Sequence, residues 1–242
     1  MAFQGKRALV TGASKGIGYG IAVALADQGA TVTAVARDFS GVVDEFTRKG
    51  VRMVALDVAS DAEELERALA GSLPVELLVN SAGTNEIDDF LEMKAAAFDR
   101  LFHVNVRGLL FVSQLVARAM VENKIRGSIV HVSSIASKLP APKHTIYCAT
   151  KGAVDAASRC MALELGAHGI RVNCVNPTVV MTDLGRLAWS DPAKADALKA
   201  TIPLGKFAEV QDVVEATLFL LSDKSGMTTR ATLNVDGGCS PY

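Results

Sequence analysis

Seven short β-rich runs that alternate with segments of helical periodicity constrain the fold of this chain more than any other feature. The runs are RALV (7–10), TVTAVA (31–36), VRMVAL (51–56), ELLV (76–79), SIVHVS (128–133), IRVNCV (170–175) and TLNV (232–235). Most are almost continuously apolar, as expected of strands that are buried on both faces. Gly29 and Gly169 stand where the intervening helices should end. This alternation predicts a doubly wound parallel sheet.

The domain organisation follows from the even distribution of these elements. No Pro/Gly/Ser linker or internal repeat divides the 242 residues, half of which are hydrophobic. We therefore expect one α/β domain over residues 1–242, a Rossmann-like sheet of about seven strands flanked by helices. The segment 181–207, which is more polar and contains prolines, is the candidate for a lid over a substrate.

Charge, leader and cysteine patterns exclude several classes of function. The net charge is −1, so a basic nucleic-acid-binding face is not expected. The chain begins MAFQGKRALV without an apolar signal region, and its longest apolar stretch, 108–120, is interrupted by Gln114 and Arg118. The four cysteines form no C-x-x-C pair and have no His partner at zinc spacing. These features predict a cytoplasmic protein with free thiols, no metal site and no membrane span.

Polar residues and a glycine follow the predicted strands, where parallel sheets of this kind bind ligands. They are Gly12, Arg37, Asp57, Asn80, Ser133, Ser134, Asn176 and Pro177. Because the carboxyl ends of parallel strands share one edge, the sequence places the chemistry on that rim, although loops begin with polar residues in any protein.

The stretch VTGASKGIGYG (10–20) follows the first strand and opens a helix. Gly12, Gly16 and Gly18 give the pattern G-x-x-x-G-x-G rather than the G-x-G-x-x-G dinucleotide pattern. Glycines let the backbone approach a pyrophosphate, and a helix N-terminus supplies free N–H groups. The alternative is a glycine-rich turn with no ligand, but the position after the first strand favours a nucleotide.

Two cations predict which nicotinamide cofactor is bound. Lys15 lies in the glycine loop, and Arg37 follows the second strand, where an adenosine ribose would lie. An acid at this strand end selects a 2′-hydroxyl, whereas a basic residue indicates a 2′-phosphate, and the strand ends in Ala36. Asp38 would oppose the phosphate if it turned inward, or it could pair with Arg37. We expect the two cations to dominate and NADP to be the cofactor.

A series of further motifs occurs in the order found in the short-chain dehydrogenase/reductase family, which the chain resembles over essentially its whole length. They are NSAG (80–83), Asn105, Ser134, Tyr147-x-x-x-Lys151, and VNP (175–177) followed by Thr182. Segments 176–195, 202–210 and 220–229 are more closely similar to L-xylulose (dicarbonyl) reductases and their tetrameric carbonyl reductase relatives. The departures are Ser81 in place of Asn, Thr178 in place of Gly (shared by the closer relatives), and Arg230 in place of Gly.

The resemblance implies roles for particular residues. The implied catalytic set is Asn105, Ser134, Tyr147 and Lys151, and the implied substrate contacts are Ser134, His144, Tyr147 and Trp189. The cofactor contacts, including the glycine loop and the two cations, are Gly12, Ser14, Lys15, Gly16, Ile17, Gly18, Arg37, Asp57, Asn80, Tyr147, Lys151, Val180 and Thr182. Trp189 could close over a substrate or fill a subunit interface. The resemblance also implies a homotetramer that pairs the helices expected at 96–120 and 147–166.

Tyr147 and Lys151 stand one helical turn apart, a spacing that also arises by chance in many helices. The reference pKa of a phenol is ~10, and a neighbouring cation stabilises the phenolate. Such a pair can donate a proton to a carbonyl oxygen or remove one from an alcohol, while Ser134 donates to the same oxygen. The predicted substrate is a short ketose or vicinal diketone and its alcohol. The alternatives are another carbonyl, such as a 3-oxoacyl thioester or generic ketone, or an inactive nucleotide-binding sensor or structural protein.

Overall fold

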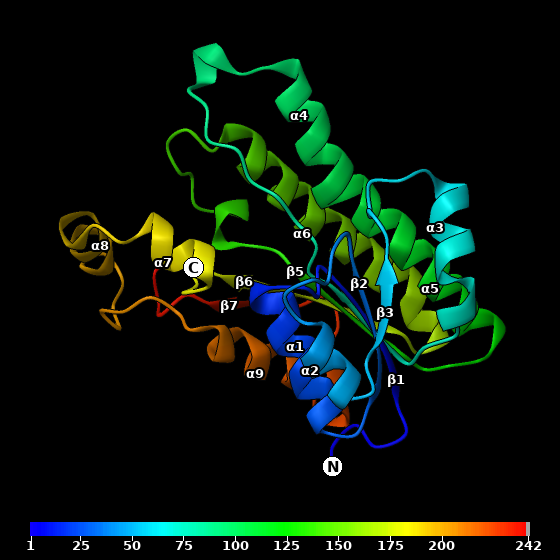
Figure 1. The fold of residues 1–242 in the computed structure, drawn as a ribbon. Helices are drawn as coiled ribbons and strands as arrows, with labels where there is room; N and C mark the ends of the chain where they lie inside the picture. The colour runs from blue at the N-terminus through cyan, green and yellow to red at the C-terminus, as the bar shows by residue number, and fades with distance from the viewer. Residues whose placement is uncertain (241–242) are drawn as a thin grey trace.

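The computed structural model describes residues 1–240, and within them the chain forms one parallel sheet of seven strands with helices on both faces (Figure 1). The strand order is β3-β2-β1-β4-β5-β6-β7. The strands are β1 (Arg7–Thr11), β2 (Thr31–Ala36), β3 (Arg52–Ala55), β4 (Leu77–Asn80), β5 (Ser128–Val132), β6 (Arg171–Pro177) and β7 (Thr232–Val235). This confirms the predicted doubly wound sheet and all seven strand positions. The strands β1, β4 and β6 extend one or two residues beyond the predicted runs, so Asn80, Asn176 and Pro177 lie within them.

Alternating side chains of the central strands enter two separate cores. Val10, Val79 and Val130 pack on one face of the sheet, whereas the preceding residues Leu9, Leu78 and Ile129 pack on the other. The register pairs Leu9 with Leu78 and Leu78 with Ile129, so each core is a continuous apolar layer. Burying one such side chain stabilises the fold by about 1.5–3 kcal/mol.

The helices divide between these two faces (Figure 1). Helices α1 (Gly16–Asp27), α2 (Val43–Arg48) and α9 (Val210–Leu221) cover the face with Val79. Helices α3 (Ala62–Leu69), α5 (Leu109–Glu122) and α6 (Thr145–Leu165) cover the face with Leu78, and α4 (Ala95–Phe102) packs on α6. Gly29 and Gly169 have φ of 91° and 72° directly after helical segments, as the sequence predicts.

One long helix contains an irregularity that the sequence does not reveal. Residues His103–Gly108 form a π-helical turn between α4 and α5, and Asn105 lies within it. By length and composition alone, the continuous helix Ala95–Glu122 is apolar enough to cross a membrane. Of its most apolar window, 44% is buried inside the protein, and length and composition alone do not separate a membrane span from a core helix. Turns of this kind are frequent at functional sites.

The segment proposed as a lid leaves the sheet and returns to it at nearly the same point. Val180 and Ala208 form an isolated β-bridge at its base, in which Met181 N donates to Ala208 O at 2.9 Å. Between them lie α7 (Asp183–Ala188) and α8 (Pro192–Lys199). Ala195, Ile202 and Phe207 form a small core of its own. The segment is therefore an excursion from the carboxyl edge of the sheet with a small core, and Leu204 N ties it to Gly237 O, after β7, at 3.1 Å.

Candidate active site

The carboxyl edge of the sheet brings together residues from β1, β4, β5 and β6. At β1, the close approach of two loops requires a glycine: a Cβ on Gly12 would lie 2.7 Å from the main chain of Ala82. Thr11 Oγ1 accepts from Ser81 N and Ala82 N at 3.1 and 3.2 Å, which fixes the NSAG segment against the glycine loop. The two motifs thus form one structural unit, and Ser81 contributes to it through its main chain.

The glycine loop leaves the start of α1 open. Within residues 1–240, no side chain caps this helix, and its first turn contains no acidic residue. Gly16 has a φ of 56°, and a Cβ placed there would lie 3.1 Å from Thr182 Cγ2. The orphan N–H groups of the first turn and the positive end of the helix dipole are therefore available to an anion beside Thr182.

A recess of about 290 Å³ lies between the glycine loop and the end of β2, and its lining residues are Ser14, Lys15, Arg37, Asp38 and Gly41. The carboxylate of Asp38 accepts from Ser40 N at 2.9 Å and from Ser40 Oγ at 2.8 Å. Hydrogen bonds from Ser40 lower the pKa of Asp38. Asp38 is thus bound by Ser40, while Lys15 and Arg37 both face the recess. Ala36 is buried at the end of β2.

Some of the polar side-chain atoms of Asn80 and Asp57 are hydrogen-bonded within the protein. Asn80 is 2% exposed, and its Nδ2 lies 2.9 Å from Ser113 Oγ and 3.2 Å from His131 Nδ1. Its Oδ1 is buried and has no hydrogen-bond partner among residues 1–240. Asp57 Oδ1 accepts from Ala59 N at 2.9 Å, which caps the turn after β3 and leaves Oδ2 for a ligand.

Tyr147 and Lys151 lie on one face of α6, and Lys151 is tied to the sheet. Lys151 is 6% exposed, and its Nζ donates to Val132 O, the last residue of β5, at 3.0 Å. The same Nζ lies 5.6 Å from the centroid of the Tyr147 ring. Ser133 Oγ donates to Lys151 O at 3.4 Å, so the serine pair after β5 is attached to the same helical turn. The structure therefore anchors a buried cation beside a half-buried phenol.

Asn105 reaches the same place from the π-helical turn. Its Oδ1 accepts from Thr84 N at 2.8 Å, and its Nδ2 donates to Thr84 O at 2.9 Å and Thr150 Oγ1 at 3.1 Å. A Cβ on Gly83 would lie 3.5 Å from Asn105 Oδ1 and 3.8 Å from Lys151 Nζ. Both distances are ordinary van der Waals contacts. Asn105, Gly83 and Lys151 are thus neighbours.

Ser134 has its main chain and its side chain held by different partners. Its Oγ accepts from Ala136 N at 3.1 Å, and its carbonyl oxygen accepts from Asn176 Nδ2 at 3.0 Å. Asn176 Nδ2 also lies 3.0 Å from Asp155 Oδ2. The sequence reading did not assign a role to Asp155, although its position four residues after Lys151 and eight after Tyr147 is a signal that could have found it.

His144 has a defined tautomer. Its Nδ1 lies 2.7 Å from Pro142 O, and because a carbonyl oxygen can only accept, Nδ1 carries the proton. In the neutral ring Nε2 is then an acceptor. The ring lies edge-on to Tyr147, with 6.4 Å between the centroids. An acceptor therefore stands near the phenol at the start of α6.

Trp189 and Thr182 occupy different parts of the excursion. The Trp189 ring lies 5.3 Å from that of Phe207, and Lys194 Nζ lies 4.6 Å from its centroid. Trp189 is thus half-buried within the excursion's own core. Thr182 Oγ1 accepts from Gly185 N at 3.1 Å and caps α7, while Val180 forms the bridge at the base.

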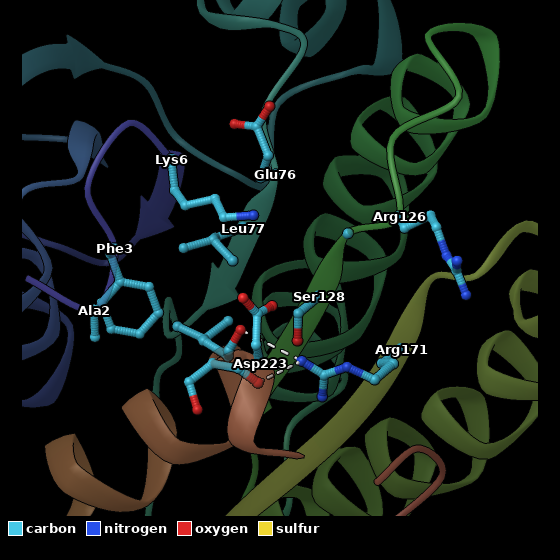
Figure 2. Close-up of a pocket in the computed structure, with 12 residues that line it drawn as sticks. Ala2, Phe3, Lys6, Glu76, Leu77, Arg126, Ser128, Arg171 and Asp223 are labelled. Atoms are coloured by element: carbon cyan, nitrogen blue, oxygen red, sulfur yellow. Dashed lines mark hydrogen bonds between the residues drawn. The ribbon is translucent and has the colours of Figure 1, made fainter. Parts of the chain in front are cut away.

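A second recess, of about 50 Å³, lies at the opposite, amino edge of the sheet (Figure 2). The most engaged of its charged groups is Arg171, whose guanidinium donates to Leu220 O at 2.8 Å and Ser222 O at 3.1 Å. These are carbonyl groups at the C-terminus of α9, so Arg171 supports that helix end. Glu76 is likewise occupied by Arg7. The charged residues that line this recess therefore stabilise the amino edge of the sheet.

The chain matches a family model described as "Enoyl-(Acyl carrier protein) reductase" over residues 12–240. D-erythrulose reductase of Gallus gallus is 53% identical over 241 residues, which cover 98% of this chain and 97% of the relative. L-xylulose reductase of Homo sapiens is 53% identical over 237 residues, which cover 97% and 96%.

Solved structures agree in fold over the whole described chain. A short-chain dehydrogenase/reductase family protein has a TM-score of 0.91 and 34% identity, with 98% of each chain covered. A gluconate 5-dehydrogenase from Burkholderia cenocepacia, solved in complex with NADP and tartrate, has a TM-score of 0.91 and 31% identity, with 98% of this chain and 95% of that chain covered.

Proposed function

Because this chain belongs to the short-chain dehydrogenase/reductase family, whose members are oxidoreductases acting on CH–OH and C=O groups, we propose that it reduces a short polar ketose or a vicinal diketone with NADPH. The observation that carries this proposal is the pairing of Tyr147 with the buried ammonium of Lys151. The names of the sugar reductases that are 53% identical to this chain support the substrate class.

The residues at the glycine loop fit a nicotinamide dinucleotide with a 2′-phosphate. The uncapped start of α1 would receive the pyrophosphate, and Lys15 and Arg37 would neutralise the 2′-phosphate in the recess that they line. Ser14, Ile17, Asp57 and the excursion residues Val180 and Thr182 complete the proposed contacts. A bound cofactor supplies the hydride for the carbonyl carbon.

The protein's own residues supply the proton and the electrostatic stabilisation. The Tyr147 hydroxyl donates its proton to the substrate oxygen, and the Lys151 ammonium stabilises the resulting phenolate. Ser134 Oγ accepts from Ala136 N, so its own hydrogen is free to point at the substrate oxygen, where negative charge develops. Through its three hydrogen bonds Asn105 connects the Thr84 segment to Thr150, the residue before Lys151 on α6.

The substrate side of this site favours a small hydroxylated molecule. With Nδ1 donating to Pro142 O, the Nε2 atom of an uncharged His144 ring is an acceptor beside Tyr147, and such an acceptor suits a substrate hydroxyl. We assign the excursion 181–207 as a lid that excludes water when it closes. Trp189 stiffens this lid from within, through Phe207 and Lys194.

We further propose a cytoplasmic homotetramer with two-fold axes. Phe98 on α4 and Leu163 on α6 are 46% and 64% exposed, on the helices expected to pair between subunits. Packing of these helices against a second copy would remove this apolar surface from water. A role in carbohydrate metabolism follows from the proposed substrate.

The rival function within the family is reduction of a 3-oxoacyl thioester or a generic ketone. The test measures kcat/KM of the purified protein for L-xylulose, diacetyl, a simple ketone and a 3-oxoacyl thioester, and for xylitol in the reverse direction, each with both cofactors. We expect L-xylulose or diacetyl with NADPH to exceed the thioester by at least about 10-fold, which is about 1.4 kcal/mol of transition-state binding. Equal or better use of the thioester would overturn the proposal.

A further inference from the structure

Asp155 is a buried acid close to the proposed catalytic face, with no role in the reaction described above. It is 3% exposed and follows Lys151 by four residues and Tyr147 by eight, so the three residues share one face of α6. Within residues 1–240, its Oδ1 is buried without a hydrogen-bond partner, and no salt bridge includes it. Burying a carboxylate oxygen that has no partner costs free energy.

The partner of Asp155 is Asn176, which connects the helix to the catalytic serine. Asn176 Nδ2 lies 3.0 Å from Asp155 Oδ2, 3.0 Å from Ser134 O and 2.9 Å from Ser137 Oγ. The two ends of a carboxamide have almost the same shape, so the surroundings decide which end points where. A carboxylate only accepts hydrogen bonds, and Asp155 therefore turns the NH₂ end of Asn176 toward the Ser134 carbonyl.

The main chain of Ser134 is in this way held from two sides. Its carbonyl oxygen accepts from Asn176 Nδ2 and from Ser137 N, both at 3.0 Å. If the amide of Asn176 were reversed, its oxygen would face the Ser134 carbonyl oxygen and repel it. The direction of the Ser134 peptide, and with it the position of Oγ, depends on the orientation of Asn176.

We propose that Asp155 is a positioning residue for carbonyl reduction: through Asn176 it holds Ser134 at a fixed position relative to the α6 face that carries Tyr147 and Lys151. This inference rests on the proposed function, because it assigns Ser134 the donation to the substrate oxygen. It adds a third tie between α6 and the sheet edge, beside the bonds of Lys151 to Val132 O and of Ser133 to Lys151 O.

Ser158 provides a matched control on the same helix. It is also 3% exposed, and it also connects α6 to β6, because its Oγ accepts from Cys174 Sγ at 3.0 Å and donates to Val154 O at 2.7 Å. This pair has no hydrogen bond to Ser134 among the residues described. Ser158→Ala thus tests the loss of a buried polar contact between the same two elements.

The experiment compares Asp155→Ala, Asp155→Asn, Asp155→Asn/Asn176→Asp and Ser158→Ala. In Asp155→Asn the side-chain oxygen can still accept from Asn176, so kcat for diacetyl or L-xylulose should stay within about 3-fold of the parent. Asp155→Ala should lower kcat by about 10-fold or more, since small misplacements of catalytic groups cost this much. The exchanged double variant keeps a helix–strand hydrogen bond but removes the side-chain donor to Ser134 O and leaves only Ser137 N, so its kcat should fall as in Asp155→Ala.

The KM for NADPH should change by less than about 2-fold in all variants, because the nucleotide end is not involved. Amide hydrogen exchange of peptides covering 134–138 should accelerate in Asp155→Ala and in the double variant, but not in Ser158→Ala. If Asp155→Ala does not fold, the two isosteric variants carry the same comparison. Three results would overturn the proposal. The first is a kcat of the double variant equal to that of the parent, and the second is a loss of kcat in Ser158→Ala as large as in Asp155→Ala. The third is a kcat of Asp155→Asn as low as that of Asp155→Ala.

Failure of the proposed function would look different. In that case the parent protein would reduce none of the carbonyl substrates, whereas hydrogen exchange at 134–138 would still report whether Asp155 holds the Ser134 segment.

Discussion

The two halves of the sheet's carboxyl edge differ in how many of their polar groups are hydrogen-bonded within the protein. At the nucleotide end, around β1 and β2, the start of α1 has no side-chain cap within residues 1–240, and the salt bridges among those residues include neither Lys15 nor Arg37. At the catalytic end, around β4 to β6, Asn105 alone makes three hydrogen bonds, and Lys151 is anchored to Val132 O. One end leaves its donors for a ligand, and the other end, apart from the hydroxyl groups of Ser134 and Tyr147, uses its donors in internal hydrogen bonds.

This difference agrees with the task proposed for each end. A ligand with several negative charges binds where donors have no other partner, because no internal bond must break first. Chemistry needs groups held in place before the substrate arrives, and internal hydrogen bonds provide that preorganisation. Substitutions at the catalytic end should therefore change kcat, and those at the nucleotide end should change cofactor preference.

The largest expected effect comes from removing the proton donor at the catalytic end. Tyr147→Phe keeps the ring beside Lys151 and deletes only the hydroxyl. We expect reduction of any good substrate to fall by at least ~10²-fold, within the range for general acid catalysis. Steady-state kinetics with diacetyl measure the loss, and quenching of protein fluorescence by NADPH measures cofactor affinity, which should be unchanged. Near-normal turnover would contradict the role of Tyr147, and weaker NADPH binding would blur the division between the two ends.

The second effect is a loss of stability in acid, which tests the contribution of a buried histidine at the catalytic end. His131 is fully buried on β5, and burial, assisted by the charge of Lys151, lowers its pKa to about 3. In the unfolded chain the pKa is about 6.5, so between these values the unfolded state binds the extra proton, and stability falls as pH falls. Between pH 6 and pH 4 this one group should remove roughly 2–3 kcal/mol of unfolding free energy.

His131→Asn keeps an acceptor for Asn80 Nδ2 but removes the titrating ring. Urea unfolding of both proteins at pH 6, 5 and 4 should show a shallower loss for the variant, whatever its stability at pH 6. If the unfolding free energies of the two proteins fell equally between pH 6 and pH 4, His131 would not control the loss of stability in acid.

The sequence predicted the strands well because their apolar runs are dictated by burial on both faces, as the cores around Leu78 and Val79 illustrate. Spacing alone also placed Tyr147 and Lys151 on one helical face, as they are in the structure. The π-helical turn at Asn105 was not predictable, because it depends on how 103–108 fits between α4 and α5 rather than on local propensity. The link from Asp155 to Ser134 was missed because it joins three elements that are far apart in the chain.

The orientation of Asp38 is a further case that only the structure resolves. The sequence allowed this residue to pair with Arg37 or to oppose a phosphate. In the structure Ser40, two residues later, takes both carboxylate oxygens. A short hydrogen-bonded turn thus decides the electrostatics of the recess, and the two cations keep their positive field.

The third effect concerns the nucleotide end. The unmodified protein should prefer NADPH over NADH by at least ~10-fold in kcat/KM, about 1.4 kcal/mol. Ala36→Asp places a carboxylate at the end of β2, beside the recess of Lys15 and Arg37, and should erode or reverse this preference. The kcat with the better cofactor should stay within a few fold, because the catalytic end is untouched. Equal efficiency of the unmodified protein with both cofactors would refute the assignment of the two cations.

The smallest effect lies away from both ends and should alter neither kcat nor cofactor preference. Arg230 precedes β7 at the amino edge of the sheet, is exposed, and has a φ of 64°, while its N donates to Val172 O at 2.8 Å. A side chain in this left-handed region costs about 1–2 kcal/mol, which glycine avoids, although glycine loses about 0.5–1 kcal/mol more backbone entropy on folding. Arg230→Gly should therefore raise the free energy of unfolding by about 0.5–1 kcal/mol in urea titrations.

Arg230→Ala removes the guanidinium but keeps the strained backbone, and should give no gain in the free energy of unfolding. If the alanine variant gained as much unfolding free energy as the glycine variant, the guanidinium rather than the backbone would be the source of the strain. A change of kcat or of cofactor preference in either variant would show that the amino edge of the sheet affects the carboxyl edge.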